Sequence, residues 1–351
     1  MKKCYVNGIG SVSAKNTFLR GFNFFEINNT DNVLYAIEPD YKDFISKVEI
    51  RRMEKGLKMS IAAVSKALEE AHLLLPQAII VGTGMSCLRS SEKFLKAMLE
   101  NNEQYLTPIN FIQSTHNTVA GQLALKHQSK GYNFNYVNGS VSFESALLDA
   151  HNQIQFGIEN DILIGGVDET NEHTLSLYKH IGFIKKEESA YNILNAKTKG
   201  MIMSEGAHFY VLQNEKSKAT YAQVIDIELI NNFTENEVAN MAQQFLAKNN
   251  MELGNIDAVV LGNNGDIEFD GYYNPLESLF AKQTNLYYKH LSGEYNTASA
   301  FGFGLACSVL KNQSIPKFTT KENPTKKEIN TVLLYNQYRG KDHSFVLLER
   351  A

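Results

Sequence analysis

The 351-residue chain has no tryptophan and only three cysteines. Cys4, Cys87 and Cys307 lie far apart and lack the spacing of a metal site, so we expect no bound metal and a reducing compartment. The sequence also lacks an apolar run long enough to cross a bilayer, and its start does not resemble a signal peptide. These absences favour a cytoplasmic protein that does not insert into membranes.

The chain also lacks an excess of one charge. Lysine and arginine number 34 against 38 aspartate and glutamate residues, which gives a net charge of -4. Such a balance provides no basic surface for nucleic acid or an anionic membrane. The charged run at 317–328 is typical of a solvated connection. With 43% hydrophobic residues, the chain can bury one large core or two ordinary ones.

Strands and helices alternate along the whole chain. Apolar residues at three- and four-residue steps predict a helix from about Arg52, with the buried stripe Met53, Leu57, Ile61, Val64 and Leu68. Apolar runs bounded by turn residues predict strands at 2–13, 77–84, 133–138, 161–169 and 205–215. The same order then recurs, with strands at 222–230 and 256–266 and a strand, turn and helix at 285–310.

This recurrence indicates an α/β protein made by internal duplication. We place an N-terminal half at 1–217 and a C-terminal half at 218–351. The proposed matches pair 78–84 with 258–265 and 133–140 with 285–293. Because α/β proteins form their sites at the C-terminal ends of strands, Ser140, Asn264 and Glu294 are expected to face one another. The glycine loop at 82–86 lacks GxGxxG and a P-loop lysine, so no nucleotide site is predicted there.

The stretch 133–150 contains a sharp strand-to-helix turn. The strand breaks at Asn138-Gly139, and Ser140 stands at the tip of the turn. Side chains at such a tip stand clear of the sheet and face the positive end of the next helix, which suits a nucleophile. An isolated serine after glycine more commonly serves tight packing. The turn is therefore a suitable position for a nucleophile, but the residues alone do not show that Ser140 acts as one.

Six segments carry a family resemblance: KKCYVNGIGSVS, RRMEKGLKMSIAAVSKALEEA, IIVGTG, DILIGGVDE, MSEGAHFYVLQ and KHLSGEYNTASAFG. In this order they resemble the β-ketoacyl-[acyl-carrier-protein] synthases of the thiolase fold, over nearly the whole chain. The resemblance implies a duplicated, five-layered αβαβα fold. It also implies an acyl carrier protein whose phosphopantetheine arm brings the substrate, with no other cofactor. The strand at 133–140 would pair across a two-fold axis to form a dimer.

The chain departs from the family pattern at the positions of the catalytic residues. The family mechanism uses a cysteine at the strand-to-helix turn and two histidines that stabilise an enolate. Ser140 stands at the cysteine's place, and Asn264 and Glu294 stand at the places of the histidines, whereas Lys289 is kept. A serine hydroxyl needs an adjacent base, and a carboxylate repels a developing enolate. The resemblance therefore implies a degenerate site.

The late glycine loop at 337–343 also departs from the family. Tyr338 stands where the gating phenylalanine would be, so we expect it at the acyl tunnel. His343 could lie near the site and replace a lost base. His290 is expected to point away from the site, and Cys307 is expected in the core.

Two function classes remain open. The first is a non-catalytic subunit similar to the chain-length factors of type II polyketide and aryl-polyene systems. Such a subunit would pair with an active ketosynthase, or with a second copy of itself, and act on chains held by acyl carrier protein. The second is an acyltransferase or hydrolase in which Ser140 accepts the acyl group and Glu294 or His343 is the base. No Ser-His-Asp arrangement is visible in the sequence to support it.

Overall fold

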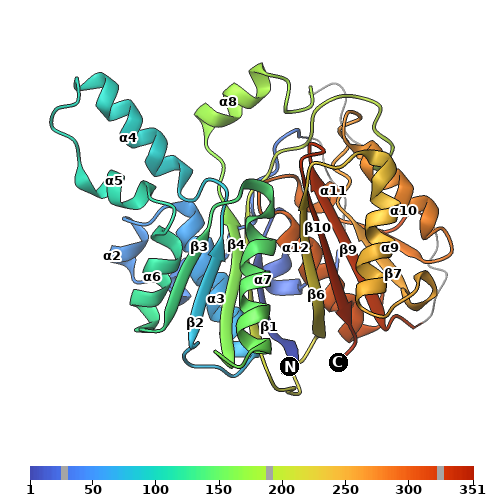
Figure 1. Ribbon diagram of the computed structural model, residues 1–351. Coiled ribbons are helices and arrows are strands. Elements are labelled where there is room, and N and C mark those ends of the chain that lie inside the picture. Colours follow the sequence, from blue (N-terminus) through green and yellow to red (C-terminus); the bar gives the residue numbers. More distant parts are fainter. Residues whose placement is uncertain (25–30, 187–192, 322–327) are drawn as a thin grey trace.

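The computed structural model describes residues 1–24, 31–186, 193–321 and 328–351. Within these residues one mixed sheet holds ten strands (Figure 1). The first half contributes β1 (Cys4–Val12), β2 (Ala78–Gly82), β3 (Tyr132–Tyr136), β4 (Asp161–Asp168) and β5 (Gly206–Gln213). The second half contributes β6 (Ala222–Asn231), β7 (Ala258–Leu261), β8 (Thr284–Tyr287), β9 (Thr331–Tyr338) and β10 (Asp342–Glu349).

The helices follow the same division. The first half contains α1 (Thr17–Arg20), α2 (Lys47–Ile50), α3 (Lys55–Glu70), α4 (Leu88–Glu100), α5 (Pro108–Ser114), α6 (Thr118–His127), α7 (Ser142–Gln155) and α8 (Glu172–His180). The second half contains α9 (Val238–Lys248), α10 (Asn274–Leu279), α11 (Lys289–Ser292) and α12 (Ser299–Asn312).

The strand order confirms the duplication. Across the sheet it is β3-β2-β4-β5-β1-β6-β10-β9-β7-β8, so each strand of one half has a counterpart at the same distance from the centre. Strand β2 pairs in parallel with β3 and β4, and β7 pairs in parallel with β8 and β9. The strands that the sequence analysis matched therefore occupy equivalent places. Within the sheet, the two halves meet in three residue pairs between β1 and β6.

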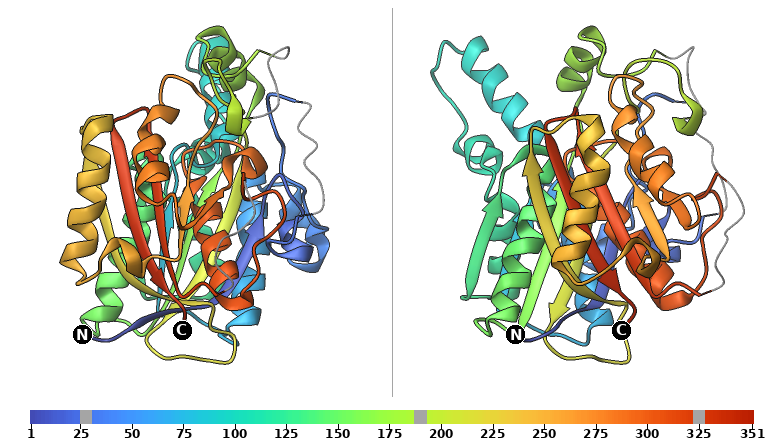
Figure 2. Two further views of the ribbon diagram at one scale, coloured as in Figure 1. Left: turned by 90° about the vertical axis from the view of Figure 1, so that its right-hand side faces the viewer. Right: turned by 45° about the vertical axis from the view of Figure 1, so that its right-hand side comes forward.

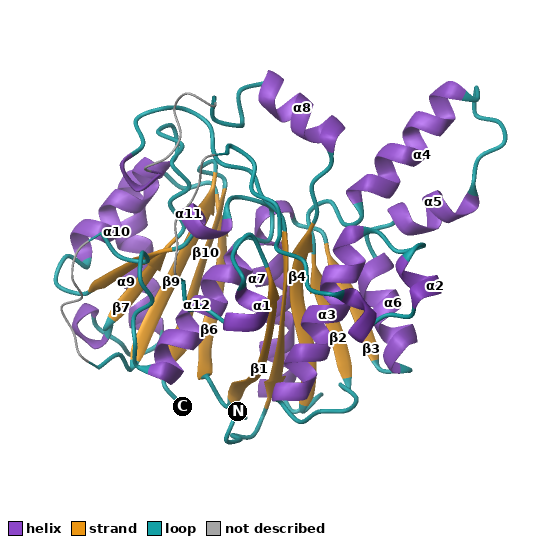
Figure 3. Cartoon of the chain, turned by 180° about the vertical axis from the view of Figure 1, so that it is seen from behind, coloured by secondary structure: helices purple, strands orange, loops and turns teal. Residues whose placement is uncertain are grey.

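Helices α7 and α12 form a layer shared by both halves. Their apolar side chains lie in one core with residues from both halves, such as Phe143, Tyr210, Phe303 and Val346. A second core lies between the first-half strands and α3 and α6, which Figure 3 shows over those strands. A third core includes residues of α9, α10 and the second-half strands. The five layers αβαβα follow from these three cores, as predicted.

Local sequence explains this packing. Every residue from Ser299 to Leu310 in α12 is buried, which suits a helix whose residues are small or apolar on all sides. Helix α3 instead buries a stripe against β1 and β5. A Cβ atom on Gly10 of β1 would lie 1.8 Å from the carbonyl oxygen of Ala63, so the glycine permits this close approach.

Helices α4, α5 and α8 extend beyond the sheet at the edge where β2 and β4 end (Figures 1 and 2). Helices α4 and α5 pack together through the rings of Phe94 and Phe111, whose centroids are 5.4 Å apart. Large apolar side chains on this arm are exposed, among them Leu95, Leu99, Tyr105, Phe111 and Ile112. The sequence analysis did not foresee the arm.

Four sequence expectations need adjustment or stay open. The helix expected from Arg52 begins at Lys55, and 289–292 forms the helical turn α11 rather than a simple turn. The charged connection falls partly at 322–327, outside the described residues. The division at 217/218 falls between β5 and β6 and stays a prediction. In the described part of the chain, no helix has both the length and the apolar character to span a membrane.

The shared layer makes a prediction about stability. Phe143 of α7 is fully buried, whereas Phe156, which follows the same helix, is 68% exposed. Phe143→Ala should lower the free energy of unfolding by about 3–5 kcal/mol, because it leaves a cavity in the core shared by both halves. Phe156→Ala should change it by less than about 0.5 kcal/mol. Urea denaturation measures both, and equal losses would contradict the shared core.

Candidate functional site

Ser140 lies at the strand-to-helix turn as the sequence indicated. After β3 the chain turns at Gly139, whose φ of 54° is in the left-handed region, and passes through the 3₁₀ turn η2 (Gly139–Val141) into α7. The Ser140 hydroxyl donates a hydrogen bond to Asp342 Oδ2 at 3.1 Å. Asp342 begins β10, so the tip of the turn is tied to the second half of the chain.

Asn264, Lys289 and Glu294 form a buried hydrogen-bonded network. The Asn264 Nδ2 and the Lys289 Nζ each donate to Glu294 Oε2 at 2.7 Å. The side chains of Lys289 and Glu294 are only 1% and 4% exposed, so this ion pair is shielded from water. Removing one partner of a buried ion pair strongly destabilises the folded protein, because the other charge stays buried without compensation.

Two further buried acidic side chains interact electrostatically with Lys289. Asp270 accepts hydrogen bonds from the backbone N–H groups of Asn264 and Gly265, at 3.0 and 2.8 Å. Burial raises the pKa of Asp270 to about 7, against a smaller opposing effect of these bonds and of Lys289. Burial also raises the pKa of Glu144, whose Oε1 accepts a hydrogen bond from Ser344. The Lys289 ammonium therefore interacts with three acidic groups.

The structure does not bring every expected residue into this network. Among the described residues, Ser140 makes no hydrogen bond to Asn264 or Glu294. His343 is buried against Phe233, with ring centroids 3.7 Å apart, and its Nδ1 lies 3.0 Å from the Tyr335 hydroxyl. Burial lowers the pKa of His343 to about 4.

The pleat of β10 explains the position of His343. Asp342 and Ser344 point toward Ser140 and Glu144, whereas His343 between them points to the outer core beside α9. His343 therefore lies on the face of the sheet opposite to the expected site. His290 also lies apart: it is buried, and its Nε2 lies 2.6 Å from the Phe318 carbonyl oxygen.

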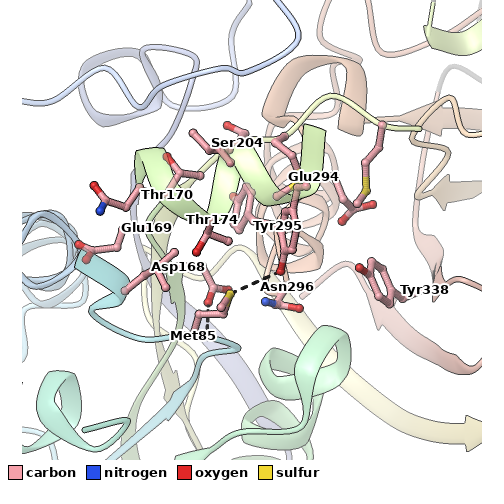
Figure 4. A pocket seen from close by; sticks show the side chains of 16 residues that line it. Met85, Asp168, Glu169, Thr170, Thr174, Ser204, Glu294, Tyr295, Asn296 and Tyr338 are labelled. Carbon is pink, nitrogen blue, oxygen red and sulfur yellow. Dashed lines mark hydrogen bonds between the residues drawn. The ribbon is translucent and has the colours of Figure 1, made fainter. Parts of the chain in front are cut away.

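A pocket opens beside the network, at the edge where β2 and β4 end (Figure 4). Its walls come from Met85 and Leu88, residues 168–171, helix α8, Met201, Met203 and Ser204, residues 294–296, and Tyr338. Glu294 and Tyr338 are the two expected site residues that line it. Ser140, Asn264 and Lys289 are not among its lining residues.

Two acidic residues at the end of β4 were missed by the sequence analysis. Asp168 Oδ1 accepts hydrogen bonds from the N–H groups of Gly84 and Met85, and Oδ2 accepts from the N–H and hydroxyl of Thr297. Asp168 thus ties the loop after β2 to the segment before α12. Burial raises the pKa of Glu169 to about 7. Their position directly after a buried strand was the signal that could have revealed them.

The lining of the pocket is made of acidic, hydroxyl, amide and apolar side chains. None of its lining residues is a histidine or a cysteine. All three cysteines are buried, and burial raises the pKa of each thiol. Within the described ranges, no group of three or more His, Cys, Asp or Glu residues is arranged to hold a metal ion.

The duplicated sheet, its shared helix layer and the turn at Ser140 define a thiolase-like ketosynthase fold. Residues 35–218, more than half of the chain, match the model of the β-ketoacyl synthase N-terminal domain. The chain belongs to the β-ketoacyl synthase family.

Relatives and solved structures agree with this assignment. The chain is 21% identical over 255 residues to 3-oxoacyl-[acyl-carrier-protein] synthase 2 of Staphylococcus aureus strain COL, and the match covers 65% of this chain and 62% of that relative. It therefore aligns with less than two thirds of that relative's length. A β-ketoacyl synthase from Burkholderia phymatum STM815 has a similar structure, with a TM-score of 0.82, 16% identity and full coverage of both chains.

A ketosynthase in complex with its chain length factor, from Xenorhabdus doucetiae, is also similar. The TM-score is 0.78 at 14% identity, and the match covers all of this chain and 98% of the other. At these identities the two structures establish a shared fold.

The buried ion pair makes a prediction about stability. Lys289→Met should lower the free energy of unfolding by about 3–5 kcal/mol, because Glu294 would remain buried without its cation. The double variant Lys289→Met/Glu294→Leu should be more stable than this single variant. As a control, Lys248→Met removes a cation that is 58% exposed beside Asp226 and should cost about 1 kcal/mol or less. Similar losses in Lys289→Met and Lys248→Met would contradict a water-shielded pair.

Proposed function

We propose that this protein is a ketosynthase-fold subunit without condensing activity of its own. It pairs with an active β-ketoacyl synthase and helps to shape the chain that this partner extends on acyl carrier protein. The carrier's phosphopantetheine arm brings the substrate, and the protein itself needs no other cofactor. The roles of Ser140, Asn264 and Glu294 as replacements of a Cys-His-His site are part of this proposal.

The observation that carries the proposal is the closed network at Glu294. A condensing site needs a thiolate to hold the acyl group and neutral donors to stabilise an enolate. Here position 140 offers a hydroxyl bonded to Asp342, and Glu294 offers a carboxylate already bonded to Lys289 and Asn264. A fixed negative charge at this place opposes the charge that develops on an enolate.

The exposed edge strand supports a partner chain. Strand β3 ends the sheet on one side, and Tyr132 and Phe134 within it and Val137 directly after it are each at least 40% exposed. An edge that presents apolar side chains and free backbone groups is a template for pairing with another strand. The opposite edge strand, β8, has three of its four residues buried. This asymmetry favours pairing through β3.

The structural relatives support the kind of partner. The similar structure from Xenorhabdus doucetiae is a ketosynthase with its chain length factor. A subunit of the same fold that lacks its own nucleophile fits the second of these two roles. A second copy of this chain remains the alternative partner for the same edge.

The serine-dependent alternative receives little support from the geometry. Glu294 directs Oε2 at Lys289 and Asn264, and His343 lies on the other face of β10. The acceptor of the Ser140 hydroxyl is Asp342, and a carboxylate is a weak base for a serine. We therefore favour the paired subunit.

The absence of a nucleophile can be tested by intact-protein mass spectrometry after incubation with an acyl-loaded carrier protein. The wild-type protein should carry no acyl adduct, because no base activates Ser140. Ser140→Cys should gain at most an acyl adduct and should still not condense malonyl units. An adduct on the wild-type protein that disappears in Ser140→Ala would overturn the proposal in favour of an acyltransferase.

The pairing edge can be tested with a charge. Phe134→Arg should abolish assembly with the synthase partner, or with a second copy, because it places an unpaired cation in the subunit interface at β3. Phe156→Arg, at an exposed site outside β3, should leave assembly unchanged. Analytical ultracentrifugation of the co-expressed chains measures both. If the wild-type protein stays monomeric both alone and with the synthase partner, this interface is excluded.

A further inference from the structure

Helix α8 covers one side of the pocket with little support from the cores. Its residues Thr174, Leu175 and Tyr178, together with Asn171 before it, share one face of the helix and line the pocket. Of the nine residues of α8, all of which the structure describes, only Leu175 is buried. Figure 1 shows the helix above the strand ends, clear of the sheet. Contacts other than core packing must therefore hold α8 in place.

The N-terminus of α8 is capped by a residue of another helix. Asn171, at the N-cap position, makes no capping hydrogen bond with its own side chain. Glu92 of α4 takes this role, because its Oε1 accepts from the N–H and the hydroxyl of Thr174, at 3.0 and 2.6 Å. Its Oε2 accepts from Asn171 Nδ2. Hydrogen bonds to a carboxylate at a helix N-terminus are comparatively strong, so Glu92 holds α8 against the pocket.

The segment that carries α8 is fixed to the rest of the protein at its two ends. On one side, the N–H and the hydroxyl of Thr170 donate to Oε2 of the fully buried Glu205, at 3.2 and 3.1 Å. On the other side, the Met201 N–H donates to the Phe183 carbonyl oxygen at 2.8 Å. Gly182 lies just inside this second point, with a φ of 76° that glycine adopts without strain. The residues between the two points can therefore turn as one unit.

The pocket behind α8 is small while the helix stays in this position. Its volume is about 30 Å³, which has room for water but not for a chain of several carbon atoms. The wall opposite α8 includes Met201 and Met203, which are only 3% and 7% exposed. These thioethers form a small apolar cluster with Leu175 of α8, and Tyr338 packs against it. Movement of α8 away from this cluster would enlarge the pocket and uncover an apolar surface.

We propose that residues 171–182 are a lid, held closed by Glu92, and that the pocket receives an apolar chain when this lid opens. The lid belongs to the single chain and does not depend on the pairing proposed above. Only the choice of ligand, an apolar chain such as an acyl group, rests on the proposed function. Because opening exposes Met201 and Met203, these two side chains report the state of the lid.

Methionine oxidation in the purified full-length protein measures the opening of the lid. Hydrogen peroxide converts an accessible thioether into a sulfoxide, which peptide mass spectrometry detects. Glu92→Ala should raise the oxidation rates of Met201 and Met203 at least roughly tenfold, because the hydrogen bonds from Thr174 and Asn171 lose their acceptor. Met59 of α3, which is fully buried in the second core, should keep its oxidation rate.

Two control variants separate the role of Glu92 from a general effect on α4. Glu92→Gln keeps an oxygen that accepts from Thr174, so the two oxidation rates should rise only roughly threefold. Glu100→Ala removes a carboxylate from the same helix, where the side chain is 63% exposed beside Lys96, and should change neither rate.

The ligand is tested with 1-octanol, a neutral apolar chain. In Glu92→Ala, added 1-octanol should slow the oxidation of Met201 and Met203 again, because a chain in the opened pocket covers both thioethers. Oxidation rates that do not respond to 1-octanol would exclude an apolar chain as the ligand.

Hydrogen exchange of the wild-type protein tests the lid without any substitution. The amides of α8 should exchange through local opening, at least roughly a hundredfold faster than those of α7 in the shared layer. Equal protection of the two helices would mean that α8 opens only when the whole protein unfolds, and the lid would be wrong. Unchanged oxidation of Met201 and Met203 in Glu92→Ala would also overturn the proposal, and so would an equal acceleration at Met59, because the effect of Glu92 would then not be confined to the lid.

Discussion

The burial of one ammonium group organises the centre of this protein. Lys289 is held inside the second half by Glu294, and the same carboxylate oxygen fixes Asn264 at the end of β7. A buried charge of this kind requires compensation in place, because water cannot supply it. The loop after β7, the turn α11 and the segment before α12 are thereby held in one arrangement.

The residues that pack the fold are different from the residues at the strand ends where a reaction would take place. Packing of α7 and α12 between the two half-sheets depends on apolar volume, and their shared core buries apolar side chains of both halves. Condensation depends on a few side chains at the strand ends. In the function that we propose, those places hold the hydroxyl of Ser140, the amide of Asn264 and the carboxylate of Glu294. A chain can therefore keep the ketosynthase fold while its strand ends serve recognition of a partner or a ligand instead of bond formation.

The sequence predicted the parts of the fold that local patterns encode. Apolar runs gave β1 to β8 and their duplicated order, but not β9 and β10 near the end of the chain. The Asn138-Gly139 turn placed Ser140 before α7. It did not predict the side of β10 on which His343 lies, because a shift of one residue exchanges the two faces of a strand. The acidic lining at Asp168 and Glu169 also escaped notice, since its meaning depends on tertiary neighbours rather than on spacing.

The junction between the halves has a consequence for how the chain could be divided. Three residue pairs connect β1 to β6, whereas the helix layer between the half-sheets buries apolar side chains from both. The connection at 215–218 is exposed. A backbone break there would sever no core contact, yet each fragment alone would uncover one side of the shared layer. The two fragments would reconstitute the native fold only in each other's presence, which makes this loop a natural point for a split-protein reporter of refolding.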